Sequence, residues 1–235
     1  MLNKFMRDNA DEDESHWMSV GDLMSGLMMI FLFIAVALML DVSKEKKKIE
    51  KVAVAYQENQ VAIYNSLKKE FENSLIKWNA DIDDKTLTFT FKSPEVLFKT
   101  GEIDLSIAYQ QVLADFFPRY MATLKPFESS ISEVRIEGHT SSLWNSHSTE
   151  KDSYFKNMDL SQGRTRSVLE YVFNLDSSAD YRPWIKSHIA AVGLSSSKPI
   201  LDESGKEDEG KSRRVSFRVI TNSEIQIKNI LETVK

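Results

Sequence analysis

Residues 17–40 read WMSVGDLMSGLMMIFLFIAVALML, and this stretch decides how the rest of the chain is interpreted. From Leu23 to Leu40 there are 18 consecutive residues without a charge. At a rise of about 1.5 Å per residue the run gives about 27 Å of helix, close to the thickness of the hydrocarbon core of a bilayer. One carboxylate, Asp22, stands at its start. The stretch therefore predicts a single transmembrane helix that carries one acidic residue.

A buried core helix and a cleavable signal peptide are the two other interpretations of this run. A core helix would keep a polar face, and residues 28–40 show none. A signal peptide needs a basic start and a small-residue cleavage site, whereas the segment before the run is acidic, with Asp8 and residues 11–14. We therefore expect a permanent anchor over residues 17–40, preceded by a flexible tail of residues 1–16.

The composition limits the remaining possibilities. The chain has 235 residues, a formal net charge of -5 and no cysteine. Beyond the anchor there is room for one domain of ordinary size. The absence of cysteine excludes disulfides and thiolate metal sites, and we expect no metal or other cofactor. No dense basic stripe is present, which argues against nucleic acid as the main partner.

Asp22 has two interpretations. It could lie at the headgroups and cap the helix, or it could face a protein interface and carry an ion. A carboxylate at the centre of a membrane helix costs about 2.5–3.5 kcal/mol, and less near the interface. Gly21 and Ser25 form a small-xxx-small pair, and Gly26 lies one turn after Asp22, so another helix can approach closely here. These neighbours favour the ion-carrying role.

Residues 41–80 predict a helical linker, because residues 41–78 are rich in Lys, Glu, Gln and Ala and contain no Gly or Pro. Larger residues recur with an eleven-residue period, which keeps them on one face of the helix. This face could form a dimer stalk or could pack against the domain of its own chain; the two interpretations carry equal weight. Its residues are Ala53, Tyr56, Gln60, Tyr64, Leu67, Phe71, Leu75 and Trp78.

Residues 81–222 predict a folded domain, followed by a surface helix or tail over residues 223–235. Alternating patterns indicate strands at 86–91, 134–137, 188–192 and 214–220. Helices are expected at 105–124, interrupted or kinked at Pro118, and at 160–175, opened by Asp159 or Ser161. This order is consistent with an α/β two-layer sandwich.

The anchor resembles the N-terminal helix of the MotB family of ion-driven stators, and the related ExbD and TolR subunits share its arrangement. The resemblance rests on Trp17, on Asp22 five residues later, and on the small and Met-rich residues that follow. It implies that Asp22 takes up and releases the ion. It also implies a homodimer within five copies of a MotA-like membrane subunit. A carboxylate does not distinguish protons from sodium, and the lack of other polar residues in the helix favours protons.

Orientation gives conflicting signals. Lys4 and Arg7 precede the anchor, and five lysines follow it between residues 44 and 51, so the positive-inside rule places the large domain in the cytoplasm. The resemblance implies the reverse arrangement in a bacterial inner membrane, with a cytoplasmic N-terminus and a periplasmic domain. We follow the resemblance, because the distal domain is similar to a cell-wall binder.

Residues 87–220 resemble the OmpA/MotB C-terminal domain, which binds peptidoglycan. Four motifs occur in order: Phe98-x-x-Gly101, residues 136–140 (IEGHT), residues 157–164 (NMDLSQGR) and residues 212–215 (SRRV). The resemblance implies that Arg164 pairs with a carboxylate of the diaminopimelate in the stem peptide. A guanidinium offers a planar fork for a carboxylate, which lysine lacks.

One departure from that family concerns the position after Gly-His-Thr. The family usually has Asp there, which holds the ammonium group of the ligand, whereas this chain has Ser141 and Ser142 after Thr140. We expect weaker binding, or a contribution from Asn157, Leu160 and a loop over residues 143–155. The predicted wall site therefore comprises five residues: Thr140, Ser141, Asn157, Leu160 and Arg164.

Several polar residues near these motifs are expected to have no direct role in binding. His139 is interpreted as a strand-end residue bonded to the backbone, and Arg213 and Arg214 as structural or surface residues. An enzyme would need His139, Glu137 and Asp159 to form an acid–base site, but no nucleophile or metal motif accompanies them. We therefore predict no catalytic residues.

Within this family, the long loop with Trp144 and the run YFKNMDLSQGRTR at residues 154–166 resemble the ZorB subunits of Zorya anti-phage defence systems. That group pairs with a MotA-like subunit called ZorA. The resemblance implies an ion-driven stator subunit in defence. The alternatives are a flagellar stator subunit and a passive tether between membrane and wall that moves no ions.

Overall fold

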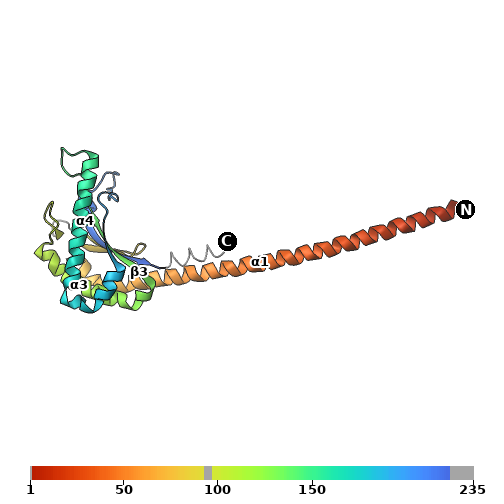
Figure 1. Cartoon of the computed structure of the whole chain (residues 1–235), viewed down its shortest axis with the longest axis horizontal. Coiled ribbons are helices and arrows are strands. Elements are labelled where there is room, and N and C mark those ends of the chain that lie inside the picture. Colours follow the sequence, from red (N-terminus) through yellow and green to blue (C-terminus); the bar gives the residue numbers. More distant parts are fainter. Residues whose placement is uncertain (1, 93–96, 223–235) are drawn as a thin grey trace. The chain divides into compact units, whose positions relative to one another are not determined.

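The computed structural model describes residues 2–92 and 97–222, and their side chains from residue 20 on except at positions 52, 55 and 56. The described residues divide into two compact units at residue 53, an N-terminal unit up to residue 53 and a C-terminal unit from residue 54 on. The helix or tail expected over residues 223–235 lies outside the described residues. Figure 1 shows the helices and strands along the sequence.

The N-terminal unit consists of the first part of helix α1, which extends from Leu2 to Lys77. The tail expected over residues 1–16 is therefore helical from Leu2 on. Val20–Lys51 is long and apolar enough to cross a membrane, with a mean hydropathy of 2.7 in its most apolar window, and none of that window is buried. Exposing apolar side chains to water on every face of a helix is unfavourable, so this segment requires a lipid or protein environment.

The last part of α1 belongs to the C-terminal unit and packs into its core. Ile63, Leu67 and Phe71 are fully buried, and Trp78 is 8% exposed just after the helix ends. Arg119 on helix α3 (Ile107–Leu124) donates to the Glu70 carboxylate over 2.7 Å. The end of α1 therefore packs against the domain of its own chain. A dimer stalk formed by the part of the linker before Ile63 stays a prediction.

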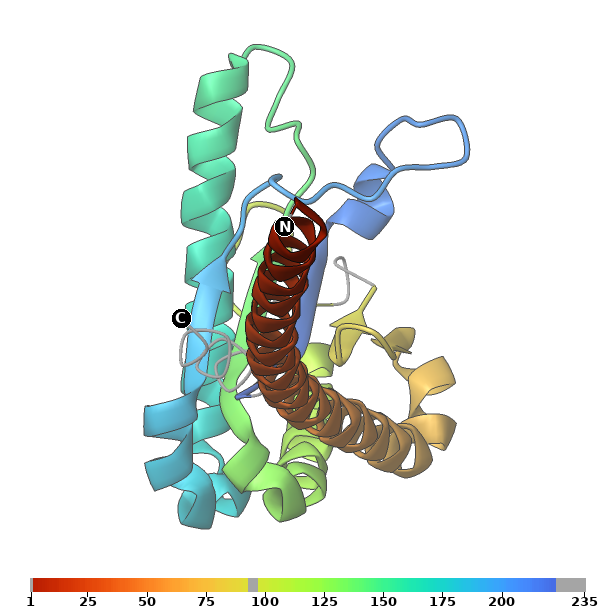
Figure 2. The same cartoon turned by 90° about the vertical axis from the view of Figure 1, so that its right-hand side faces the viewer.

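The domain has a five-stranded sheet in the order β1-β2-β5-β3-β4. The strands are β1 Ala80–Asp83, β2 Thr88–Phe91, β3 Ile131–His139, β4 Ile189–Gly193 and β5 Arg214–Thr221. Only the β3–β4 pair is parallel. The parallel pair needs a crossover connection, which helix α4 (Glu150–Asn174) and the short helices after it supply. Consequently the C-terminal ends of β3 and β4 lie at the same edge, beside α4 (Figure 2).

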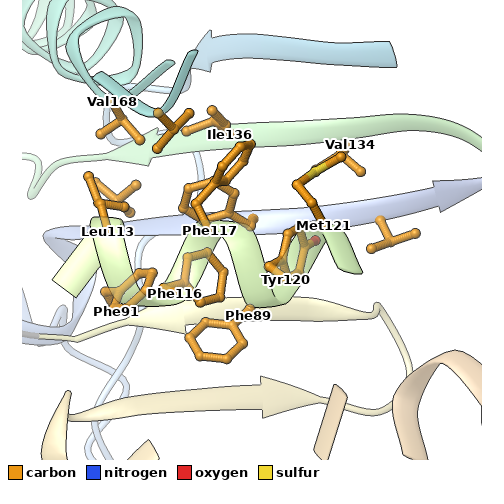
Figure 3. Close-up of a cluster of buried hydrophobic side chains, with 14 of the residues drawn as sticks. Phe89, Phe91, Leu113, Phe116, Phe117, Tyr120, Met121, Val134, Ile136 and Val168 are labelled. Atoms are coloured by element: carbon orange, nitrogen blue, oxygen red, sulfur yellow. The ribbon is translucent and has the colours of Figure 1, made fainter. Parts of the chain in front are cut away.

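One face of the sheet carries the core. Phe89, Ile136 and Phe217 alternate with polar residues along β2, β3 and β5, and all three are fully buried. Against them α3 places Phe116 and Phe117 (Figure 3). The Phe116 ring centroid lies 4.6 Å from that of Phe89 and 5.0 Å from that of Phe217. Helices on one face of the sheet confirm the two-layer α/β sandwich.

Helix α4 is longer than the sequence pattern predicts. It extends from Glu150 to Asn174 and not from residue 160, because the Thr149 hydroxyl accepts a hydrogen bond from the backbone N–H of Asp152 and caps it. Neither Asp159 nor Ser161 opens a helix. Likewise α3 is not interrupted, since Pro118 lies inside it.

Several short elements were absent from the prediction. Strand β1 was missed because it has only four residues, ADID, and two of them are Asp, a residue that is depleted in strands; the pairing with β2 defines it. The others are η1 (Lys125–Ser130), η2 (Asp176–Tyr181), α5 (Arg182–His188) and α6 (Glu209–Ser212).

Candidate functional site

The five predicted wall-binding residues meet in one pocket of about 370 Å³. Thr140 and Ser141 come directly after β3, and Asn157, Leu160 and Arg164 come from α4. The spacings of three and four residues place the α4 side chains on one face of the helix. The remaining lining residues are Phe98, Thr100, Gly101, Leu143, Trp144 and Arg213.

Arg164 is the buried cation of the pocket, with 8% of its surface exposed. Its Nε donates to the Glu102 carbonyl over 2.9 Å and its Nη2 to the Lys99 carbonyl over 3.1 Å. Its guanidinium also stacks on the Phe98 ring. These two bonds use two of its five N–H groups, and they fix the guanidinium against the turn that precedes α3.

No carboxylate of the described residues lies within ion-pair distance of Arg164. Burial, with a contribution from the charge of Arg213, lowers the pKa of Arg164 to about 10. A buried cation without a counter-ion is unfavourable, and an anion that enters the pocket relieves that cost. The site can therefore accept a carboxylate.

Thr140 and Ser141 are held by backbone contacts. The Thr140 N–H donates to the Ser195 carbonyl over 2.9 Å, and the Asn157 amide donates to the Ser141 carbonyl over 3.0 Å. Ser195, itself fully buried, also donates its hydroxyl to the Tyr154 carbonyl on α4. The buried Thr140 hydroxyl has no hydrogen-bond partner among the described residues. Thr140 lines the pocket, and a buried hydroxyl without a partner favours a ligand that bonds to it.

A carboxylate approaches the turn after β3 from an unexpected place. Glu207, in the hairpin over residues 201–207, accepts the backbone N–H of Ser142 at 3.1 Å and also the Ser142 hydroxyl. Glu207 therefore stands one residue away from Ser141, the position where the resemblance led us to expect an acid.

His139 differs from its predicted role. Its Nε2 lies 3.5 Å from a carboxylate oxygen of Glu137, and its Nδ1 has no hydrogen-bond partner among the described residues. The expected bond from its ring to the backbone is therefore wrong. Glu137 and His139 are each 4% exposed, whereas Asp159 is exposed on α4. The three residues of the hypothetical acid–base site are not brought together.

Asp22 lies on the exposed part of α1, in the apolar segment. Ser25, one turn later, donates its hydroxyl to the Gly21 carbonyl over 2.8 Å. A Cβ built on Gly21 or Gly26 would meet nothing within 4 Å. The helix therefore has little side-chain bulk at Gly21 and Gly26 near Asp22, and the Ser25 hydroxyl is bonded within the helix.

A comparison with known proteins gives the family. Over 222 residues the chain is 51% identical to the Zorya protein ZorB of Escherichia coli (Crooks strain), and the aligned region covers 94% of each chain. The chain belongs to the ZorB family. Within it, residues 97–213 match the model of the OmpA family. These residues include every lining residue of the pocket.

Solved structures similar to this member of the ZorB family are more distant. A MotB-like protein from Desulfovibrio vulgaris is 23% identical, covers 69% of this chain and 91% of its own, and gives a TM-score of 0.49. The cell wall anchor of the T6SS from Pseudomonas aeruginosa is 19% identical, with coverages of 66% and 96% and a TM-score of 0.45. The apolar N-terminal helix and the OmpA-family domain of the ZorB-family chain fit a single-pass protein of the inner membrane.

Sequence reasoning missed part of the site in this ZorB-family chain. Arg213 lines the pocket, although it was expected to be a structural or surface residue and not a ligand contact. Arg214 donates to the carbonyls of Ser212 and Lys198, which is a structural role. Leu143 and Trp144 also line the pocket; they belong to the loop over residues 143–155 that was expected to contribute, but neither was named as a site residue. Two adjacent apolar residues in a loop of Ser, Asn and His were the signal that could have identified them.

Proposed function

We propose that this chain is the MotB-like subunit of an ion-driven stator complex of the Zorya anti-phage type, anchored to peptidoglycan through its C-terminal domain. Two copies would lie within five copies of a ZorA-like, MotA-like membrane subunit. The 51% identity to ZorB favours defence over a flagellar role. The observation that carries the proposal is Arg164, a buried cation without a carboxylate partner in the described residues, in a pocket formed by all five predicted wall-binding residues.

The wall-binding half of the proposal depends on what the pocket can hold. A stem peptide presents carboxylates, and Arg164 offers N–H groups beyond the two bonded to the Lys99 and Glu102 carbonyls. Thr140 adds a buried hydroxyl for which no hydrogen-bond partner is found in residues 20–92 and 97–222. A charged hydrogen bond and a neutral one, both shielded from water, give a ligand carboxylate a defined orientation.

The membrane half depends on Asp22. Among the residues whose side chains are described, no hydrogen bond or ion pair to Asp22 is found, and the helix around it is apolar. Partner helices can approach closely at Gly21 and Gly26. Such helices would enclose the Asp22 carboxylate in a medium of low dielectric. Proton uptake there changes the charge of the interface and so the packing of the surrounding helices, which is how ion flow would drive movement.

Asp22→Asn tests the ion-carrying role, because it preserves shape and removes the titratable group. We expect normal insertion and co-purification of the ZorA-like subunit, with loss of phage protection and of proton flux into vesicles. Ser25→Ala, in the same turn, is the matched control and should retain protection. Full protection in Asp22→Asn would support the passive tether instead.

Arg164→Ala tests the wall site. Full-length protein in detergent should pull down with purified sacculi, and the variant should not, while its thermal unfolding stays cooperative. Arg166→Ala, an exposed arginine on the same helix, is the control for loss of charge alone. Equal pull-down of the Arg164 variant and the wild type would remove the assignment of this pocket.

Orientation needs its own test, since the lysines after the anchor oppose the proposed topology. Peptidoglycan lies outside the inner membrane, so the domain must be periplasmic if it binds the wall. A single cysteine introduced at Ser204, in the exposed hairpin, should react with a membrane-impermeant maleimide in intact spheroplasts. Labelling only after lysis would place the domain in the cytoplasm and contradict wall binding.

A further inference from the structure

The loop between β3 and α4 carries exposed apolar side chains at the pocket. Leu143 is 57% exposed and Trp144 is 36% exposed, and both line the pocket that also contains Arg164. The loop extends beyond the end of the sheet toward the first turn of α4 (Figure 2). A tryptophan left in water at a pocket is unfavourable unless a ligand covers it.

This loop is ordered by its own hydrogen bonds. The Asn145 side-chain oxygen accepts from the His147 N–H over 3.0 Å and from the Ser148 hydroxyl over 2.9 Å. The Ser142 N–H is held by Glu207 at the start of the loop, and Thr149 caps α4 at its end. Trp144 is therefore presented from a fixed loop, which reduces the entropy cost of binding a ligand.

The chemistry of the loop differs from that of the Arg164 end. No Asp, Glu, Lys or Arg occurs between Glu137 and Glu150, although 28% of the whole chain is charged. The short polar side chains that line the pocket beside Leu143 and Trp144 are likewise uncharged, namely Thr100, Thr140 and Ser141. The pocket thus has a cationic end at Arg164, suited to an anion, and an end lined by the uncharged side chains of Leu143 and Trp144, with the Lys156 ammonium near the indole ring.

A neutral ring with apolar faces and hydroxyl groups at its edge matches the second end. The aromatic plate can cover the apolar C–H face of such a ring, and the hydroxyl groups can bond to short polar side chains or water. A pyranose has this structure, whereas a stem peptide carries several charged groups along its chain. The Lys156 ammonium lies 6.0 Å from the Trp144 ring centroid and occupies one side of it.

We propose that Leu143 and Trp144 form a second subsite, which binds a pyranose ring of the glycan next to the stem peptide held at Arg164. The proposal rests on the proposed function, because it assumes that the pocket binds peptidoglycan. A ligand that spans both ends carries the sugar and the peptide together. The subsite would make the domain select intact muropeptides over free peptide.

Trp144→Ala tests this subsite with two ligands: a disaccharide tetrapeptide muropeptide, and the same tetrapeptide without sugars. Affinities are measured by calorimetry with the full-length protein in detergent. We expect Trp144→Ala to weaken muropeptide binding about tenfold, equivalent to about 1.4 kcal/mol, and to change tetrapeptide binding less than about twofold. Trp144→Tyr keeps an aromatic plate and should recover most of the affinity.

Phe155→Ala is the matched control, since Phe155 is 56% exposed near the start of α4 and does not line the pocket. It should leave both affinities unchanged. Equal loss for both ligands in Trp144→Ala, or no loss for either, would overturn the sugar subsite while leaving wall binding in place. Failure of the wild type to bind either ligand would overturn the proposed function itself.

Discussion

The guanidinium carbon of Arg164 lies 4.7 Å from the centroid of the Phe98 ring, although the two residues belong to different sequence motifs. Phe98 is 2% exposed, so the contact is shielded from water. A cation over an aromatic face contributes about 0.5–2 kcal/mol, more when it is desolvated. The ring therefore keeps the guanidinium in place as well as filling space.

Replacing Phe98 by leucine should separate these two roles. The substitution keeps an apolar side chain, so we expect a stability loss below about 1.5 kcal/mol. The loss of the aromatic face should weaken muropeptide binding about fivefold, within the range of a cation–π contact. Calorimetry and urea unfolding measure both quantities, and unchanged affinity would show that Arg164 is held by the Lys99 and Glu102 carbonyls alone.

Glu207→Gln should loosen the turn after β3. The glutamine keeps one acceptor oxygen for Ser142 but removes the charge, and hydrogen bonds to charged groups are worth about 1.5–3 kcal/mol against about 1 kcal/mol for neutral ones. Hydrogen exchange of the Ser142 amide should become about tenfold faster, which corresponds to about 1.4 kcal/mol. Glu203→Gln, exposed in the same hairpin, is the control, and similar exchange rates in the two variants would contradict the role of Glu207.

Arg119→Ala should destabilise the domain by about 2 kcal/mol, a typical cost of losing a partly buried charged hydrogen bond. Arg119 donates to the side chain and the backbone carbonyl of Glu70 and stacks on Phe71 at 4.8 Å, so it ties α1 to α3. The comparison is Lys125→Ala, which removes an exposed pair with Glu128 inside η1 and should cost less than about 1 kcal/mol. Urea unfolding of the two variants would show equal losses if the link between the helices were unimportant.

Acidification should lower the stability of the domain in two stages. Burial, aided by the charge of Arg214 and opposed by the hydrogen bond to Glu137, lowers the pKa of His139 below its ordinary value of 6.5. The unfolded chain then binds a proton more readily than the folded one, so stability present above pH 6.5 is lost as the pH falls toward the folded pKa.

Glu137 contributes the second stage. Burial raises its pKa, but the hydrogen bond with His139 and the charges of Lys198 and Arg218 outweigh this, and the net pKa lies below 4.5. Its contribution is present above that pH and is lost below it. His139→Gln should remove the first stage and also weaken the second, because the hydrogen bond with His139 helps to lower the pKa of Glu137. Urea midpoints at pH 7.5, 5.5 and 4 measure both stages. His147→Gln, in the exposed loop, should keep the wild-type profile, and an unchanged first stage in His139→Gln would contradict the assignment.

Much of the fold followed from local patterns. The uncharged run from Leu23 to Leu40 predicted the anchor, because a helix that spans a bilayer needs a long run of apolar residues and such a run is visible in the sequence. The alternation at β2 and β5 identified these strands because one face of each is buried. By contrast, the part of α4 before residue 160 was not predicted: residues 150–159 show no apolar stripe, and the Thr149 cap starts the helix.

The sequence by itself determined the anchor, its single acid, and the order of motifs that brings Thr140, Asn157 and Arg164 into one pocket. Only the tertiary structure decided what surrounds them, because those contacts join residues far apart in the chain. Glu207 reaches Ser142 across 65 positions, and Arg164 reaches the Lys99 carbonyl across another 65. Local periodicity carries no signal for such pairs; they form because the parallel β3–β4 pair and the close approach of α4 bring these segments to one end of the sheet.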